Sequence, residues 1–124
     1  KTPLRIFEKT YARVINKVRE RGYTPLIMSL PPMNAQQYFN FFTSNFNDTQ
    51  KSNVLKWLHG SVNTIWAGHE LYNDAVKRVA SATDCVLIDC TTTLGDGKNY
   101  LCDDGIHPNL AGQSKIASII LRNT

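Results

Sequence analysis

The residues best suited to chemistry lie in one short segment, "DDGIHPNLAGQ", at residues 103–113. Asp104 and His107 are three positions apart in it, so in a tight turn the carboxylate can reach the Nδ1–H of the imidazole. Such a bond fixes the tautomer and orientation of the ring, stabilises the imidazolium and leaves Nε2 free to accept a proton. These two residues would supply the acid and the base of a Ser-His-Asp triad, whose nucleophile must come from elsewhere.

Spacing alone leaves other interpretations of this segment open. An Asp before a helix often serves only as a cap or turn former, beside a histidine with a structural role. Asp103, Asp104 and His107 could also hold a metal ion. However, no further His or Cys stands at ligand spacing, since His59 and His69 lie far back in the chain on expected helices. We therefore expect no metal and no other cofactor.

The cysteines offer a further alternative. Cys102 could be a nucleophile partnered by His107, but groups this close in sequence seldom face each other across a cleft. With Cys85 and Cys90 it makes an odd number without paired C-x-x-C spacing. We expect buried free thiols, with a bridge from Cys90 to Cys102 as the alternative.

Composition and charge limit the partners. The 124 residues fit one globular domain, and no apolar stretch approaches the roughly 18 residues of a membrane-spanning helix. Seven of the 14 basic residues lie in the first 21 positions, at a helical spacing opposite an apolar face that holds the aromatic rings. This pattern predicts a surface helix with a solvated basic face, and we expect neither a membrane span nor nucleic-acid binding.

The elements that must position the segment are helices alternating with two buried strands. The first strand, "TPLIMSL", is followed by Pro31-Pro32, and the second is "DCVLIDC". We expect helices at residues 3–21, 50–59, 62–82 and 109–122, strands at 24–30 and 84–90, and irregular turns at 91–102.

Residues 33–49 are rich in aromatics and asparagine without a clean period, which predicts a long loop with at most a short helical turn. At the carboxyl end of a strand, such a loop is a candidate pocket wall. The alternative is that its aromatic rings pack it onto its own domain.

Strands joined through helices predict a parallel sheet with right-handed crossovers. Two strands are too few, because their side chains are too apolar for open edges with unpaired backbone groups. We expect the isolated chain to pair with its own N-terminal part, with a swapped copy or in aggregates.

The segment "DDGIHPNLAGQSKIASII" resembles the last block of the SGNH (GDSL-type) hydrolases, in which an Asp-x-x-His-Pro segment supplies the acid and base of the triad. The resemblance covers almost all of the chain. It includes the amphipathic helix, the strand ending in Pro-Pro, the helix with "ELYNDAVKRVA" and the strand "VLIDC". It implies a flavodoxin-like α/β fold, a three-layer α/β/α sandwich with a five-stranded parallel sheet. Residues 1–124 would then be the C-terminal portion of a single domain.

The resemblance implies that His107 is the general base and later the general acid, and that Asp104 orients it. The family's Gly-Asp-Ser nucleophile block and the Gly and Gly-x-Asn-Asp blocks of its oxyanion hole are missing here. Ser29 ends an expected strand but lacks the glycines of a nucleophile elbow, so we expect it to be structural. Losing these groups together would leave this segment inactive by itself.

We therefore expect a serine esterase or acylhydrolase that acts on a carbohydrate ester or another small ester. Its serine would lie on an N-terminal segment of the same protein that carries the Ser, Gly and Asn blocks. The alternative is a catalytically inactive SGNH-like interaction domain. The sequence selects neither the acyl group nor the compartment nor the oligomeric state, and it assigns no substrate-binding residue.

Overall fold

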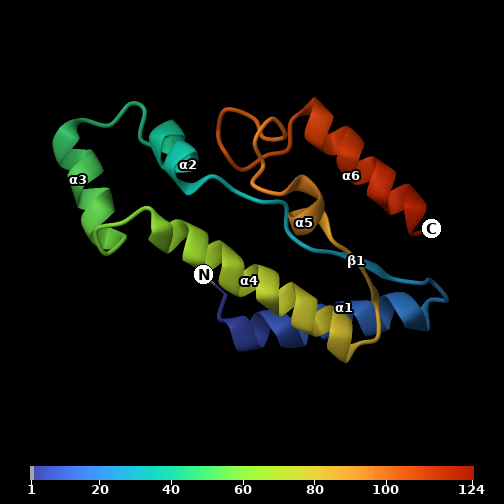
Figure 1. Cartoon of the computed structure of the whole chain (residues 1–124). Helices are drawn as coiled ribbons and strands as arrows, with labels where there is room; N and C mark the ends of the chain where they lie inside the picture. The colour runs from blue at the N-terminus through green and yellow to red at the C-terminus, as the bar shows by residue number, and fades with distance from the viewer. Residues whose placement is uncertain (1) are drawn as a thin grey trace.

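The computed structural model describes residues 2–124, with Lys1 outside the description, and it is a mixed α/β fold (Figure 1). The described residues form six helices and a parallel sheet of two strands. The elements are α1 (Leu4–Glu20), β1 (Leu26–Met28), α2 (Ala35–Phe42), α3 (Asp48–Trp57), α4 (Asn63–Ala82), β2 (Val86–Ile88), α5 (Cys90–Leu94) and α6 (Leu110–Arg122). The predicted order of helix, strand, helices, strand, loop and helix is confirmed, except that the short helix α5 lies between the second strand and the loop.

The predicted parallel pairing of the two strands is also confirmed. Ile27 of β1 stands opposite Leu87 of β2, and helices pack on both sides of the pair (Figure 1). On one side, Ile27 contacts a core cluster from α1 and α4, which contains Ile15, Val76, Val79 and Ala80. On the other, Ile88 packs with Ile119 of α6. These two small clusters hold the strands between the helices.

Both strands have one unpaired edge within residues 2–124. The backbone N–H of Ser29 donates to the carbonyl of Ile88 (2.9 Å), and alternation along a strand turns the N–H and C=O of Met28 away from β2. Leu26, Met28 and Val86 are 38%, 39% and 49% exposed. The described strands are therefore apolar and open at their edges, an arrangement that proteins usually cover.

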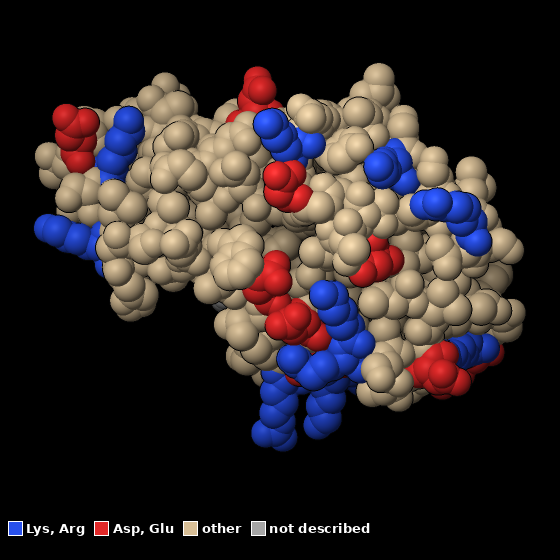
Figure 2. Space-filling model, viewed as in Figure 1, with Lys and Arg blue, Asp and Glu red and all other residues tan. Residues whose placement is uncertain are grey.

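A groove of about 780 Å³ lies between α1 and β1. Its lining is largely apolar and consists of Thr2, Phe7, Thr10, Tyr11, Val14, Ile15, Val18, Pro25, Leu26 and Ile27. The outer face of α1 carries the predicted basic residues of the described chain, which are exposed and gather along the lower edge of the molecule in Figure 2, while Lys1 lies outside the described residues. Glu8 pairs with Arg78 of α4 at 2.8 Å beside this face. No helix in the described part of the chain is both long and apolar enough to cross a bilayer.

The expectation of a long loop at residues 33–49 was wrong, because α2 occupies its first half. The Asn34 side chain accepts a hydrogen bond from the N–H of Gln37 (2.9 Å) and so caps the helix. Ala35 and Phe39 are buried one turn apart. Two turns are too short for the helical period to stand out in the sequence, whereas the Asn-x-x-Gln pattern resembles a capping signal that sequence reasoning missed.

The turn expected directly after the second strand begins instead with a short helix, α5. Asp89 caps it by accepting the N–H of Thr92 (3.0 Å). Its three consecutive threonines have low helix propensity, which explains why no helical signal stands out here. The strands are also shorter than predicted, at three residues each.

A buried polar cluster ties the carboxyl ends of both strands to α4. Asn73 is fully buried, accepts a hydrogen bond from the N–H of Leu30 (2.8 Å) and donates to the Thr91 hydroxyl (2.9 Å). That hydroxyl donates to the Leu30 carbonyl (2.7 Å). Ser29 is 1% exposed and donates to Asp89 (3.1 Å), so its hydroxyl has a structural role, as expected from the sequence.

Replacing Asn73 by alanine tests this cluster. The change leaves the Leu30 N–H without its acceptor and opens a small cavity, so we expect the free energy of unfolding to fall by about 2–4 kcal/mol. Urea unfolding followed by circular dichroism measures the loss. The matched control is Asn53→Ala on the exposed face of α3, expected within about 0.5 kcal/mol of wild type. Equal losses in the two variants would show that the cluster does not stabilise the fold.

Candidate active site

The loop with the Asp-x-x-His segment connects α5 to α6 and is folded by its own backbone bonds. Leu101 and Pro108 form an isolated antiparallel bridge. The N–H of Cys102 donates to the carbonyl of His107 (2.7 Å), and the N–H of Gly105 donates to the carbonyl of Cys102 (3.0 Å). These bonds close a tight turn that holds residues 103–106 at its tip.

Helix α2 anchors the tip of the loop. The N–H of Asn34 donates to the Gly105 carbonyl (2.8 Å), and the Gln37 side chain donates to the Asp103 carbonyl (3.0 Å). Gly105 has φ +73°, and a Cβ there would lie 2.8 Å from the Asn34 carbonyl oxygen. Only glycine permits both this backbone conformation and this approach. Sequence reasoning did not find Asn34 and Gln37, whose one local signal is the capping pattern.

The other end of the loop is fixed by Asn109, which caps α6. Its side-chain oxygen accepts the N–H of Gly112 (2.9 Å), while its amide donates to the carbonyl of Asn99 (2.9 Å). The predicted helix at 109–122 is thus confirmed with its start at Leu110.

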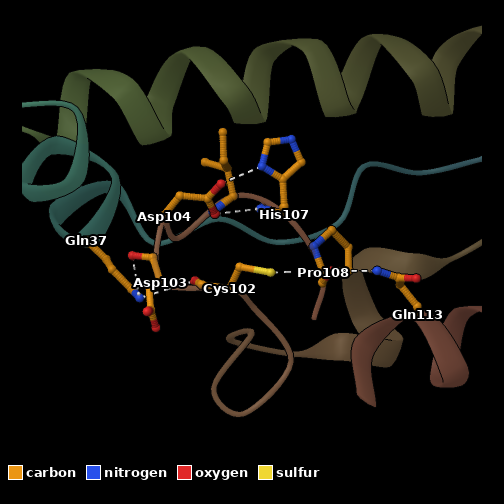
Figure 3. A network of polar contacts seen from close by, with 8 residues as sticks. Gln37, Cys102, Asp103, Asp104, His107, Pro108 and Gln113 are labelled. Carbon is orange, nitrogen blue, oxygen red and sulfur yellow. Dashed lines mark hydrogen bonds and ion pairs between the residues drawn. The ribbon is translucent and has the colours of Figure 1, made fainter. Parts of the chain in front are cut away.

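The predicted contact between Asp104 and His107 is present. Oδ2 of Asp104 lies 2.5 Å from Nδ1 of His107, and Oδ1 accepts the backbone N–H groups of Ile106 and His107, both at 3.0 Å (Figure 3). The carboxylate therefore holds both the imidazole and the backbone that carries it.

The electrostatics follow from these bonds. The hydrogen bond from His107, followed by those from the two amides, lowers the pKa of Asp104 to about 2. The imidazole side chain is 71% exposed, and that of Asp104 is 15% exposed. Within residues 2–124, no hydrogen bond engages Nε2. A carboxylate that stays ionised thus orients a ring whose second nitrogen is open to a reactant.

Asp103 and Cys102, the other candidate residues next to the pair, do not contact the imidazole. In Figure 3 the carboxylate of Asp103 points to the other side of the loop, and the sulfur of Cys102 points to the Pro108 carbonyl, 3.7 Å away. Nowhere in residues 2–124 do three His, Cys, Asp or Glu side chains gather in a way that could hold a metal ion. No serine of the described residues hydrogen-bonds to His107.

All three cysteines are free, so the structure does not contain the alternative bridge from Cys90 to Cys102. Cys90 is buried, and burial raises the pKa of its thiol. The expectation of burial was wrong for Cys102, which is exposed. It follows Leu101, whose bridge to Pro108 lies in the loop between α5 and α6 rather than in the core. Cys85 is half-buried, and its sulfur accepts from Arg19 (3.3 Å).

Together the fold and this loop define a mixed α/β chain with an Asp-His pair after the second of two parallel strands. Comparison with protein-family models, with curated proteins and with solved structures finds no match. The case for a function therefore depends on the chemistry of the pair and its surroundings.

The bond between Asp104 and His107 predicts a titration. In carbon-13 NMR, the carboxyl of Asp104 should titrate at about pH 2, and His107→Ala should move that midpoint toward the ordinary 3.8. Because the pKa is lowered in the folded protein, the carboxylate stabilises the fold above about pH 4, and this contribution is lost as the pH falls toward 2. A midpoint near 3.8 in the wild type would show that the bond does not persist in solution.

Gly105→Ala tests how α2 holds the loop. The matched control is Gly22→Ala, because Gly22 has φ +83° with nothing within 4 Å of an added Cβ. The control should cost about 1–2 kcal/mol for its left-handed backbone. Gly105→Ala should cost more in urea unfolding and should raise the Asp104 midpoint, since the added methyl pushes the loop off Asn34. Equal losses with an unchanged midpoint would contradict the close approach.

Proposed function

We propose that this chain supplies the base and the acid of a serine esterase or acylhydrolase. The observation that carries the proposal is the Asp104–His107 pair, with Nδ1 bonded to a carboxylate of low pKa and Nε2 open to solvent. An ionised carboxylate on Nδ1 and a free Nε2 are the arrangement that a general base in acyl transfer requires.

In the proposed reaction, a serine hydroxyl attacks the carbonyl carbon of an ester while Nε2 of His107 takes its proton. The tetrahedral intermediate collapses, and His107 donates that proton to the departing alcohol, leaving an acyl-serine. Water then attacks the acyl group with His107 again as base, and the acid and the free serine are released. Asp104 remains ionised and stabilises the imidazolium, and the chemistry needs no cofactor.

The serine would lie on polypeptide that precedes Lys1 in the same protein and that carries the missing Gly and Asn blocks. The open edge of β1 and the apolar groove beside α1 support this part of the proposal, because both call for a further strand and its flanking helix. A parallel strand next to β1 would run in the same direction, so its carboxyl end would lie on the side where α2 holds the His107 loop. Ligands of such sheets bind at these carboxyl ends. With three further strands in all, the sheet would have the five strands of the three-layer sandwich of the SGNH hydrolases.

A catalytically inactive interaction domain is the second candidate. One observation favours it: no serine of the described residues hydrogen-bonds to His107. Ser29, directly after the first strand, is buried in the polar cluster at the carboxyl ends of the strands. Under this proposal the chain keeps the scaffold and the orienting carboxylate without a nucleophile.

A serine-directed fluorophosphonate separates the two candidates in the full-length protein. The probe should label a serine upstream of Lys1, and His107→Ala should abolish the labelling because the hydroxyl loses its base. Asp104→Asn should slow labelling by about 10⁴-fold, the usual cost of losing the orienting carboxylate. Mass spectrometry of the labelled peptide identifies the serine.

The control is Asp103→Asn, the same change at the adjacent carboxylate, which does not contact the imidazole. It should label at the wild-type rate. A folded full-length protein that does not label would favour the interaction domain, and equal slowing by the two substitutions would remove the special role of Asp104.

A further inference from the structure

A second groove lies between α2, the end of α3 and the first half of α4 (Figure 1). Its volume is about 860 Å³, within the size range of small-molecule sites. Of the described residues that line it, none is Asp, Glu, Lys or Arg, and none belongs to the loop that carries His107. The groove is therefore separate from the Asp104–His107 pair, and the proposed esterase assigns no role to it.

The groove has exposed aromatic walls. Trp57 at the end of α3 is 78% exposed, and Phe42 of α2 is 37% exposed. Tyr38, one turn before Phe42, packs against it with 5.1 Å between the ring centroids. Large aromatic rings left this open to water are typical of a surface that binds a ligand through the faces of its rings.

The same walls carry hydrogen-bonding groups. Six of the eleven lining residues have such a group on the side chain, namely Tyr38, Trp57, His59, Thr64, His69 and Tyr72. All of these groups except the Trp57 indole are of a kind that both donates and accepts. The lining is thus neither a hydrocarbon surface nor a charged one, and it suits a ligand that combines apolar faces with hydroxyl groups.

One of these groups lacks a partner. Nδ1 of His69 is buried and has no hydrogen bond within residues 2–124. Oε1 of Glu70 lies 3.6 Å from this nitrogen, which is beyond hydrogen-bond distance. Leaving a buried ring nitrogen unbonded costs free energy, so the groove is incomplete here without a further polar group. Because the ring of His69 lines the groove, a hydroxyl of a bound ligand would supply that group.

The second imidazole of the lining stands on a strained backbone. His59 is exposed and has φ +58°, in the left-handed region that glycine adopts without strain and other residues do not. Strain of this kind gathers at binding sites, where the position of the side chain matters more than the stability of the fold.

A neutral oligosaccharide fits these features together. Its rings have C–H faces that pack on aromatic rings, and its hydroxyls both donate and accept, as do the imidazole and phenol groups of the lining. A hydrocarbon chain would leave the imidazoles unbonded, and an anionic polymer would meet no Lys or Arg among the described lining residues. A flat aromatic compound would use the rings and few of the polar groups.

We infer that this groove is a binding site for a neutral oligosaccharide, which packs on Trp57 and hydrogen-bonds to His59 and His69. The inference does not depend on the proposed esterase.

NMR titrations of the nitrogen-15-labelled full-length protein with cellotriose and, separately, with maltotriose test the inference. At least one sugar should bind and shift the indole N–H of Trp57, and it should leave that of Trp66 in place, because Trp66 lies on α4 outside the groove lining. Glucose should bind about tenfold more weakly than the trisaccharide, because one ring fills only part of the groove. No binding of either trisaccharide, or a shift of Trp66 alone, would overturn the inference.

Two further probes represent the other kinds of ligand. Octanamide carries a hydrocarbon chain, and benzamide is a flat aromatic compound. Both should bind more weakly than the better trisaccharide, because neither bonds to the two imidazoles. Tighter binding of either amide at the Trp57 resonance would assign the groove to that kind of ligand instead.

The two tryptophans provide a matched pair of variants. Trp57→Ala should lower the affinity for the trisaccharide about tenfold, because the sugar loses the ring on which it packs. Trp66→Ala should leave the affinity within about twofold, although Trp66 is also 50% exposed. Equal effects of the two substitutions would place the sugar elsewhere.

Substitutions of the two histidines separate binding from folding. His69→Phe removes an unbonded buried nitrogen, and His59→Gly relieves a left-handed backbone, so neither should lower the free energy of unfolding in urea. Each should nevertheless weaken trisaccharide binding about fivefold through the lost hydrogen bond. Unchanged affinity in either variant would contradict the inference.

Fluorophosphonate labelling is scored separately. Trisaccharide binding without labelling supports this groove and removes the esterase. Labelling without trisaccharide binding supports the esterase and overturns the inference.

Discussion

The carboxyl ends of the two strands are held together by hydrogen bonds through the buried side chain of Asn73, and the positions of the other elements near the candidate site depend on this constraint. The amide bonds Leu30, two residues after β1, and the hydroxyl of Thr91 in the first turn of α5. It thereby ties α4 to the chain that leads into α2 and to α5. Since α2 in turn anchors the tip of the 103–107 turn, a buried amide on α4 fixes the geometry around an exposed imidazole some distance along the chain.

The Asp104 carboxylate links the fold of the turn to its chemistry. One oxygen accepts the two backbone amides that shape the turn, and the other orients the imidazole. The same bonds that fold the loop therefore keep the carboxylate ionised, as stabilisation of an imidazolium requires. These shared bonds explain how a short exposed loop can hold the Asp104–His107 pair in one geometry without a deep pocket around it, provided that α2 keeps the tip in place.

The two grooves differ in what they lack. The groove along α1 borders a strand edge whose backbone groups have no strand partner within residues 2–124, so its deficit is in main-chain hydrogen bonds as well as in apolar cover. A second groove, between α2 and α4, is bounded by helices, whose backbones are satisfied internally, and its lining includes His69, whose buried Nδ1 has no hydrogen-bond partner within residues 2–124. The first therefore suits a strand, whereas the second leaves a side-chain nitrogen unpaired.

The sequence by itself determined the order of the long elements, the parallel pairing of the strands and the contact between Asp104 and His107. Each depends on a local pattern: helical periodicity over many turns, short apolar runs between helices, and a three-residue spacing within one turn. Only the tertiary structure decided that α2 would form, that it would anchor Gly105 through Asn34, and that Cys102 would be exposed. The contacts of Asn34 with Gly105 and of Gln37 with Asp103 join residues more than sixty positions apart, and no local pattern records them, whereas α2 itself has only a short capping pattern.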